Sequence, residues 1–266
     1  MSTPRYVDTH CHLGLMSNAD TVAKQLKDLG LCVFDCGVGP REFNAAAVRA
    51  KIYASAVAGV GLHPWWLADG RCGAAEIDLL CERAVSSRFI GEVGLDFSPR
   101  FIDSKDIQTM AFRRLCATLA TRPRAGRVLS IHAVRSASMA LDMLAKSGLL
   151  RGNVNSPAII FHWFSGTSDE LTRARNAGCH FSVNEMMLKT KRGREYARQI
   201  PLDRLLLETD APPHLGESYS AQALIDQLER TLDSLAYIRG MEKAALSAAV
   251  AENGAELFIA DDKLKS

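Results

Sequence analysis

Six residues of the chain are of the types that bind divalent metal ions, and they are spread along most of its length. They are His10, His12, Glu92, His132, His162 and Asp210. Each follows a short apolar run with the composition of a β-strand. Ligands at the carboxyl ends of parallel strands converge at one mouth of an α/β barrel. We therefore predict a centre that holds two divalent ions, which could activate water for hydrolysis.

The first two histidines lie in VDTHCHL, residues 7–13. Side chains at positions i and i+2 of a strand point to the same face, so both imidazoles could bind one ion. A pair of ordinary polar residues at a strand end would have the same spacing. The pattern alone leaves both interpretations open.

Glu92 follows a strand in FIGEVGLDF, residues 89–97, with Gly91 and Gly94 close by. A carboxylate can bridge two cations, and small neighbours leave room for ions near the backbone. The alternative is a solvated loop glutamate. His132 closes VLSIH and His162 closes AIIFH; together they are interpreted as nitrogen ligands of the second ion, although either alone could be a core histidine.

Asp210 lies in DRLLLETDAPP, residues 203–213, where two prolines prevent an immediate helix and stiffen the loop. Glu208 is the competing acid, and we interpret it as a barrel-lining partner that orients a ligand. The mixed ligand set suits Zn²⁺, Mn²⁺ or hydrated Mg²⁺, and four imidazoles argue against Mg²⁺ alone. The identity of the metal stays open.

The elements that must position these residues alternate between short apolar runs and longer amphipathic stretches, which is typical of βα units around a parallel sheet. Eight strands are expected at 5–9, 31–36, 55–61, 88–92, 127–131, 157–161, 178–183 and 204–208. Helices are expected at 18–29, 41–51, 74–84, 107–121, 137–147, 168–177, 191–199, 219–239 and 241–258. Eight strands in 266 residues predict one (β/α)8 TIM barrel domain over 1–266 with extra C-terminal helices.

Composition excludes several classes of protein. A formal net charge of +2 gives no reason for strong nonspecific attraction to nucleic acid, so any polyanion site must be local. No segment has the length and apolarity of a membrane span, and the amino terminus does not resemble a signal peptide. The seven cysteines form no closely spaced framework and are expected to be reduced and buried. We expect a soluble, cytoplasmic protein.

Further residues follow strands on the expected site face. His63, in GVGLHPWW, is assigned to substrate contact or leaving-group protonation, with a structural role at the rim and metal ligation as the alternatives. Arg100, Arg135 and Lys189 could hold phosphates, and Trp163 could stack on a base. Solvated surface charges and a pocket-wall aromatic are the alternatives.

With these motifs assembled, the chain resembles the TatD family of metal-dependent deoxyribonucleases, within the amidohydrolase-like TIM barrels. The resemblance rests on VDTHCHL, GLHPWW, GEVGLDF, LSIHAVRS, FHWFSG and LLLETDAPP, in this order. It implies that one ion is held by His10, His12, Glu92 and Asp210 and the other by Glu92, His132 and His162. It also implies phosphodiester hydrolysis, usually exonucleolytic on DNA.

The chain departs from the family after His132, where members usually carry an arginine two residues on and this chain has Val134 and then Arg135. The segment HWFSGTSDEL, with FSVNEMMLKTKRGREYARQIPLDRLLLETDAPP, is similar to QatD, the TatD-like component of a bacterial antiphage system. This narrower resemblance implies other proteins of a defence system as partners.

Our mechanistic hypothesis is that Glu92 bridges the ions while Asp210 binds one of them and accepts a proton from the attacking water. Two other functions fit much of the pattern. A binuclear amidohydrolase or lactonase would use the same ions, but a bridging carboxylated lysine is typical there and no lysine lies at a strand end before Lys189. A partner-dependent subunit of a defence complex is the other alternative.

Overall fold

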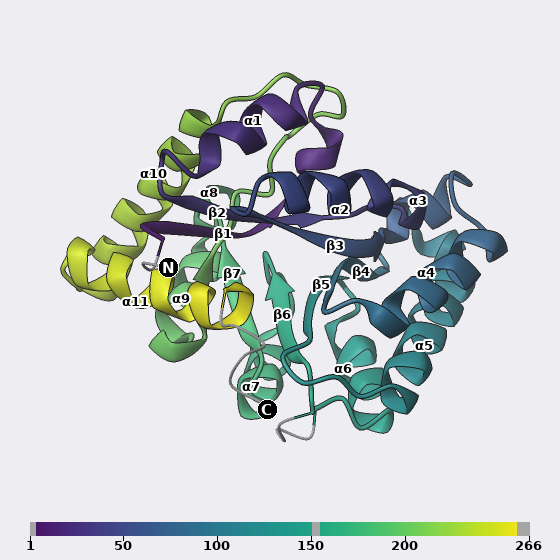
Figure 1. Ribbon diagram of the computed structural model, residues 1–266. Helices are drawn as coiled ribbons and strands as arrows, with labels where there is room; N and C mark the ends of the chain where they lie inside the picture. The colour runs from purple at the N-terminus through teal and green to yellow at the C-terminus, as the bar shows by residue number, and fades with distance from the viewer. Residues whose placement is uncertain (1–3, 151–154, 260–266) are drawn as a thin grey trace.

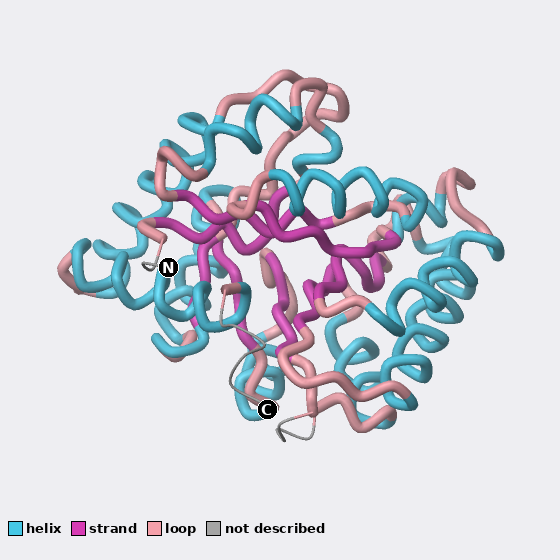
Figure 2. The backbone as a smooth tube through the Cα atoms, in the orientation of Figure 1, coloured by secondary structure: helices cyan, strands magenta, loops and turns pink. Residues whose placement is uncertain are grey.

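The computed structural model describes residues 4–150 and 155–259, and parallel strands form its centre (Figure 2, magenta). The strands are β1 (Tyr6–Cys11), β2 (Leu31–Cys36), β3 (Ala56–Leu62), β4 (Phe89–Asp96), β5 (Val128–Val134), β6 (Ala158–His162), β7 (His180–Val183) and β8 (Leu205–Leu207). They form one 8-stranded sheet in the order of the chain, and every recorded pairing is parallel. This is the predicted TIM barrel.

Helices surround the strands on the outside (Figure 1). They are α1 (Ala19–Leu26), α2 (Phe43–Ile52), α3 (Pro64–Ala68), α4 (Ala74–Ser86), α5 (Lys105–Thr121), α6 (Ala137–Lys146), α7 (Ser168–Asn176), α8 (Glu185–Leu188), α9 (Lys191–Gln199), α10 (Ala221–Arg239) and α11 (Lys243–Phe258). Short 3-10 helices are η1 (Leu13–Leu15), η2 (Pro40–Glu42), η3 (Ile102–Ser104) and η4 (Leu202–Arg204). The last two long helices, α10 and α11, are the predicted C-terminal additions.

Local sequence explains the ends of α7. The Thr167 side chain accepts a hydrogen bond from the backbone N–H of Glu170, whose carboxylate accepts one from the Thr167 N–H in return. Gly178, with φ +76°, follows the helix in the left-handed conformation that suits glycine. The predicted boundaries are therefore correct to within a residue.

Five strands end later than predicted, β3 and β6 by one residue and β1, β4 and β5 by two or more. His10 lies inside β1, Glu92 inside β4 and His132 inside β5, and His162 is the last residue of β6, so these four residues do not follow their strands. The prediction ended each strand where apolar residues gave way to polar ones, but strand pairing continues into the barrel mouth, where polar side chains face the lumen. The short helices α3 and α8 were also not predicted.

The barrel interior is layered, because alternate residues of a strand face the same side. In β5, Val128, Ser130 and His132 follow one another toward the carboxyl end. A separate apolar cluster includes Val7, Phe34, Val128, Ile160 and Leu206, together with Cys32, Cys36 and Phe258 of α11. Above it Ser130 reaches His10, with 2.7 Å between Oγ and Nδ1. The polar side chains therefore lie at the mouth of the barrel, and the apolar cluster lies below them.

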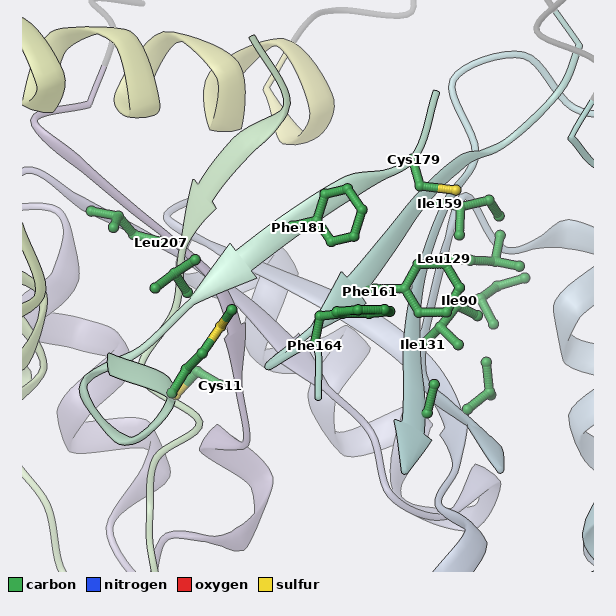
Figure 3. Packing of buried hydrophobic residues seen from close by; sticks show 14 of the residues in the cluster. Cys11, Ile90, Leu129, Ile131, Ile159, Phe161, Phe164, Cys179, Phe181 and Leu207 are labelled. Atoms are coloured by element: carbon green, nitrogen blue, oxygen red, sulfur yellow. The ribbon is translucent and has the colours of Figure 1, made fainter. Parts of the chain in front are cut away.

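The larger core lies between the strands and the outer helices. Figure 3 shows Phe161, Phe164 and Phe181 gathered beside Leu129 and Ile131, all of them buried. Phe164 also packs on Tyr196 of α9, with ring centroids 5.9 Å apart. Burial of these aromatic side chains anchors the helices on β5 to β7, each contributing about 1.5–3 kcal/mol.

The seam between β1 and β8 is closed by a buried aspartate. Asp8 accepts hydrogen bonds from the backbone N–H of Thr209 at 3.0 Å and from its hydroxyl at 2.6 Å. The N–H of Asp210 donates to the carbonyl of His10 at 2.9 Å. These bonds bring the segment after β8 against β1, so Asp210 reaches the first two histidines.

No helix of the described residues is long and apolar enough to cross a membrane. All seven cysteines have free thiols, and Cys81 is the least buried of them.

Candidate metal centre

The carboxylate of Glu92, which is 1% exposed, lies at the centre of a ring of histidines. Its Oε2 is 3.3 Å from Nε2 of His10 and 3.3 Å from Nε2 of His12. Its Oε1 is 2.7 Å from Nδ1 of His132 and 2.8 Å from Nε2 of His162. The two oxygens therefore face two different pairs of imidazoles, as a bridging carboxylate requires.

The first pair and its acids have the spacing of ligands around one ion. Nε2 of His10 and Nε2 of His12 are 3.3 Å apart, and Oδ1 of Asp210 is 3.3 Å from His12 and 3.8 Å from His10. A tetrahedral ion bound at about 2.0–2.1 Å holds its ligand atoms about 3.3–3.4 Å from one another. The nitrogens of His10 and His12 and Oε2 of Glu92 have this spacing, and Asp210 has it toward His12 while lying 3.8 Å from His10.

The hydrogen bonding of His12 tests whether a cation fits. Its Nδ1 lies 2.7 Å from the carbonyl oxygen of Cys36, which can only accept, so Nδ1 carries a proton. A neutral His12 would then point the Nε2 lone pair at oxygens of Glu92 and Asp210, an arrangement that is repulsive without a cation. Burial opposes the charged ring, yet the bonds to Asp210 and Glu92 raise the pKa of His12 to about 10. A metal ion could replace that proton.

His132 and His162 form the second half of the centre. Their facing nitrogens, Nδ1 of His132 and Nε2 of His162, are 3.3 Å apart. Burial disfavours their charged forms, but neighbouring carboxylates raise the pKa of both. Together with Glu92 they form a second set of donors on the opposite side of its carboxylate.

Two buried acids lie beside these histidines. Oδ2 of Asp96 lies 3.2 Å from Nε2 of His132, and Oε1 of Glu208 lies 3.6 Å from Nδ1 of His162. Ser182 and Asn184 donate hydrogen bonds to Glu208 and hold it in place. Glu208 therefore lies beside His162, within reach of its charge but beyond hydrogen-bond distance of Nδ1. Ordering of ligand rings by such acids is common at metal sites.

Asp96 and Asp8 were missed in the sequence. Burial alone would raise the pKa of Asp96, but hydrogen bonds from His132, Trp65 and Ser98 lower it. For Asp96 the available signal was a period of two, because Asp96 and Glu92 lie four residues apart on β4 and both contact His132. Asp8 gave no such signal, because the register of β1 shifts between Asp8 and Cys11. Both look like ordinary strand-end polar residues until the tertiary contacts are known.

Glycines let the strands approach closely around Glu92. A Cβ on Gly61 would lie 1.8 Å from the carbonyl oxygen of Gly37, which accepts a hydrogen bond from the N–H of Glu92 at 2.7 Å. Gly94, with φ +143°, lies so close to β5 that a Cβ would be 2.1 Å from the carbonyl oxygen of His132. A side chain at either position would displace a candidate ligand.

His63 approaches the same carboxylate from β3. Its Nδ1 accepts a hydrogen bond from the backbone N–H of Trp65 at 3.1 Å, so the proton of the neutral ring is on Nε2, 3.1 Å from Oε1 of Glu92. Burial is the main cause that lowers the pKa of His63 to about 4. The side chain is therefore a neutral hydrogen-bond donor at the edge of the donor set.

A cavity of about 1010 Å³ opens above these residues. Its lining includes His12, His63, Glu92, His132, His162 and Asp210, and aromatic and apolar side chains form much of its wall. The structure thus places imidazoles and carboxylates at the base of a space large enough for part of a nucleotide chain or a small organic molecule.

Residues 7–259 match the family model described as TatD related DNase. The chain belongs to the TatD family. The match covers every motif that suggested the resemblance and both halves of the donor set. The chain is thus a member of a family of metal-dependent hydrolases.

Two curated relatives show how far the likeness extends. The 3'-5' ssDNA/RNA exonuclease TatD of Escherichia coli (strain K12) is 26% identical over 264 residues, which cover 92% of this chain and 97% of the relative. The deoxyribonuclease TATDN3 of Homo sapiens is 23% identical over 169 residues, which cover 64% of this chain and 59% of that protein. The similarity to the bacterial TatD protein therefore spans nearly the whole of both chains.

Solved structures confirm the fold. A TatD family hydrolase from Entamoeba histolytica has a TM-score of 0.77 at 18% identity, over 98% of this chain and 100% of that chain. YJJV, a TatD homologue from Escherichia coli K12, has a TM-score of 0.73 at 21% identity, over 97% and 100%. The organophosphorus hydrolase of Deinococcus radiodurans is more distant, with a TM-score of 0.56 at 13% identity, over 97% and 93%.

The residues predicted to contact substrate are divided between the cavity and its surroundings. Trp163 and Lys189 line the cavity. Arg100 and Arg135 are exposed and are not among the lining residues. Both could contact phosphates only of a substrate that extends beyond the cavity.

Three residues at the mouth have unusual backbone conformations for residues with a side chain. Arg135, Trp163 and Asp210 have φ values of +53°, +38° and +56°. Such conformations are strained and concentrate at functional sites, where the surrounding structure holds them. Arg135 directly follows β5 and Trp163 directly follows β6, each of which carries a candidate ligand, and Asp210 is itself a candidate ligand after β8.

Proposed function

We propose that this TatD family member is a divalent-metal-dependent deoxyribonuclease whose two ions activate water for phosphodiester hydrolysis. The observation that carries the proposal is the position of Glu92, whose two oxygens face His10 and His12 on one side and His132 and His162 on the other. We assign one ion to His10, His12, Glu92 and Asp210 and the other to Glu92, His132 and His162. Mg²⁺, Mn²⁺ and Zn²⁺ are the candidate ions.

When bound, the two ions would lower the pKa of a water molecule and neutralise charge on the phosphoryl oxygens. The protein must then accept the proton of that water. Asp210 is the better candidate, because its side chain is 23% exposed to the cavity side while that of Glu92 is 1% exposed. Glu92 is fully engaged by histidines and serves as the bridge.

His63 supports the reaction from the rim. Its Nε2–H points at Oε1 of Glu92 from the cavity lining, where a substrate oxygen could compete for the same proton. The low pKa of about 4, caused mainly by burial, supports a neutral hydrogen-bond donor more than a strong acid. We therefore favour substrate contact over protonation of the leaving group.

Finer aspects of the proposal rest on relatives and on the narrower sequence resemblance. One relative carries the name 3'-5' ssDNA/RNA exonuclease, which supports exonucleolytic action on DNA by this chain as well. Membership of the QatD subgroup, a role in antiphage defence with partner proteins, and a cytoplasmic location are proposed from the sequence. Genomic neighbourhood would test the defence role directly.

An amidohydrolase or lactonase on a small substrate is the second candidate. The structure of an organophosphorus hydrolase matches 97% of this chain. A cavity of about 1010 Å³ would also admit a small substrate. Against it, the bridging position on β4 is occupied by Glu92 and not by a lysine that could be carboxylated. A partner-dependent subunit of a defence complex remains the third candidate.

Degradation of end-labelled DNA tests the proposal. The protein is incubated with labelled single-stranded and duplex DNA in Mg²⁺, Mn²⁺, Zn²⁺ or chelator, and with lactones and phosphotriesters in parallel. We expect metal-dependent cleavage of DNA, reduced about 10²–10⁴-fold in Asp210→Asn, which keeps the size of the side chain but removes its basicity. Full activity of a metal-loaded Asp210→Asn protein would refute the assigned role, and turnover confined to lactones or triesters would refute the nuclease.

A further inference from the structure

The three tryptophans of the chain, Trp65, Trp66 and Trp163, all line the cavity above the donor set. From their arrangement we infer that Trp65 is the platform on which an unpaired base at the end of the substrate stacks, so that base stacking more than phosphate contact holds the nucleic acid at the cavity. The inference rests on the proposed nuclease function, and it assigns to Trp65 the selection of unpaired ends.

Trp65 is fixed relative to the metal ligands. Its indole Nε1 donates a hydrogen bond to Oδ2 of Asp96 at 2.7 Å, and the same oxygen lies 3.2 Å from Nε2 of His132. The rings of Trp65 and His132 are 6.0 Å apart, and those of Trp65 and His63 are 4.9 Å apart. A base on this indole would therefore place the adjoining phosphate beside the donor set.

The indole is supported and still accessible. Trp65 stacks on Phe101 with ring centroids 5.1 Å apart and an interplanar angle of 25°, and the guanidinium of Arg100 lies over Phe101 at 5.0 Å. Even so, Trp65 is 41% exposed. A large aromatic surface that is held in place and open to solvent is the arrangement used by stacking platforms for single strands.

The other two tryptophans are less suited to this role. Trp66 is partly buried against the core, and the guanidinium of Arg71 lies 4.3 Å from its ring centroid. Trp163 is also packed against the core. Trp163 could form the opposite wall of the cavity, but it lacks the exposed area of Trp65.

Arginine and lysine are scarce among the residues that line the cavity, where Arg71 and Lys189 represent them, and the cavity histidines contact the carboxylates of Glu92 and Asp210. Arg71 is paired with Asp69 at 2.6 Å. Two phosphate contacts would give a slope of about −1.4 in a plot of log affinity against log salt for a single strand. A duplex end, whose terminal bases are already stacked and paired, gains little from an indole, so unpaired ends are selected.

The test is equilibrium binding by the full-length protein, with and without Mg²⁺. The ligand is a fluorescein-labelled single strand whose terminal linkages are phosphorothioates to slow hydrolysis, and a blunt duplex is the comparison. Fluorescence anisotropy measures affinity, and quenching of intrinsic fluorescence reports the cavity because every tryptophan lies there. We expect single strands to bind more tightly than duplex, with a shallow salt dependence.

Variants identify the stacking residue. Trp65→Ala should weaken single-strand binding about 5- to 150-fold, the effect of losing one base–aromatic stack. Trp65→Phe keeps an aromatic ring, so its affinity for the single strand should fall much less. Tyr237→Ala, which removes an aromatic side chain that is 90% exposed on α10, is the matched control and should bind as the unaltered protein does.

A terminal abasic nucleotide gives an independent measurement on the unaltered protein. The abasic strand should bind the unaltered protein more weakly by the same factor as Trp65→Ala weakens binding of the normal strand. Combining the two changes should lower the affinity little further, because both remove the same contact. Additive losses, unchanged binding by Trp65→Ala or undetectable binding by the unaltered protein would each overturn the inference. If the protein still cleaves DNA in those cases, only the stacking inference is wrong and the proposed nuclease function is kept. If the protein turns over only lactones or triesters, the nuclease function itself is wrong.

Discussion

Oδ2 of Asp96 lies 3.2 Å from Nε2 of His132 and holds that ring so that Nδ1 faces Glu92, 2.7 Å away. Because a carboxylate only accepts, the proton of the neutral ring is on Nε2 and the lone pair of Nδ1 is free for a metal. Asp96 thus sets the tautomer of a candidate ligand without touching the proposed ions itself.

The first prediction concerns this positioning. His132 and Trp65 now donate to Oδ2 of Asp96, and the Ser98 N–H donates to Oδ1. In Asp96→Asn one of these oxygens becomes an NH₂ group, which must then face a donor. We expect the affinity of the second ion to fall about 10- to 100-fold while the first ion is retained. Calorimetric metal titration measures both, with Asp69→Asn as a control at an exposed acid. Equal loss of both ions would contradict the positioning role.

Chelation should destabilise the protein. Removing the ions leaves the Nε2 lone pair of His12 facing the oxygens of Glu92 and Asp210 unless the ring takes up a proton. An ion present at about 100 times its dissociation constant contributes about 2.7 kcal/mol, or about 5–10 °C in Tm. Differential scanning calorimetry before and after EDTA measures the shift. His12→Ala should show a smaller shift, and an unchanged Tm after proven metal loss would exclude the predicted linkage.

His63 should affect turnover without holding an ion. Removal of a hydrogen-bonding group that acts in the reaction lowers kcat/KM about 10²-fold or more. We therefore expect His63→Ala to lose activity on DNA and to keep its metal content, measured by elemental analysis. His214→Ala, at an exposed histidine after β8, is the control. Normal catalysis by His63→Ala would make His63 a structural residue of the rim.

A histidine away from the donor set should make the protein sensitive to acid. Burial, reinforced by Arg204, lowers the pKa of His180 to about 4. An unfolded chain binds a proton at this histidine near pH 6.5, so between pH 6.5 and pH 4 the unfolded state binds more protons and stability falls as pH decreases. Lowering pH from 7.5 to 5 should cost about 1–2 kcal/mol at this site.

His180→Gln, whose amide oxygen can still accept from Arg204, should remove that part of the acid sensitivity. Urea denaturation of both proteins in EDTA at the two pH values gives the difference, and titration of the other histidines cancels between them. The same pH dependence in both proteins would show that folding does not lower the pKa of His180.

The order of strands and helices could be predicted because it depends on local properties that a single sequence contains. Apolar runs of strand length alternate with amphipathic stretches, and the predicted helix 191–199 matches α9 (Lys191–Gln199) because its apolar face and its capping Thr190 are both local. Boundaries failed at β4 (Phe89–Asp96), where strand pairing continues past the apolar residues into the mouth.

The donor set was predictable because parallel strands place their carboxyl ends together, which turns scattered histidines and acids into neighbours. The sequence by itself therefore determined the barrel and the six residues that face one another at its mouth. Only the tertiary structure decided which oxygen of Glu92 faces which histidines, that Asp96 and Asp8 orient the ligands, and that Trp65 lies at the cavity while Arg100 does not line it. These relationships depend on strand register and side-chain direction between residues far apart in the chain, and no local pattern of a single sequence encodes them.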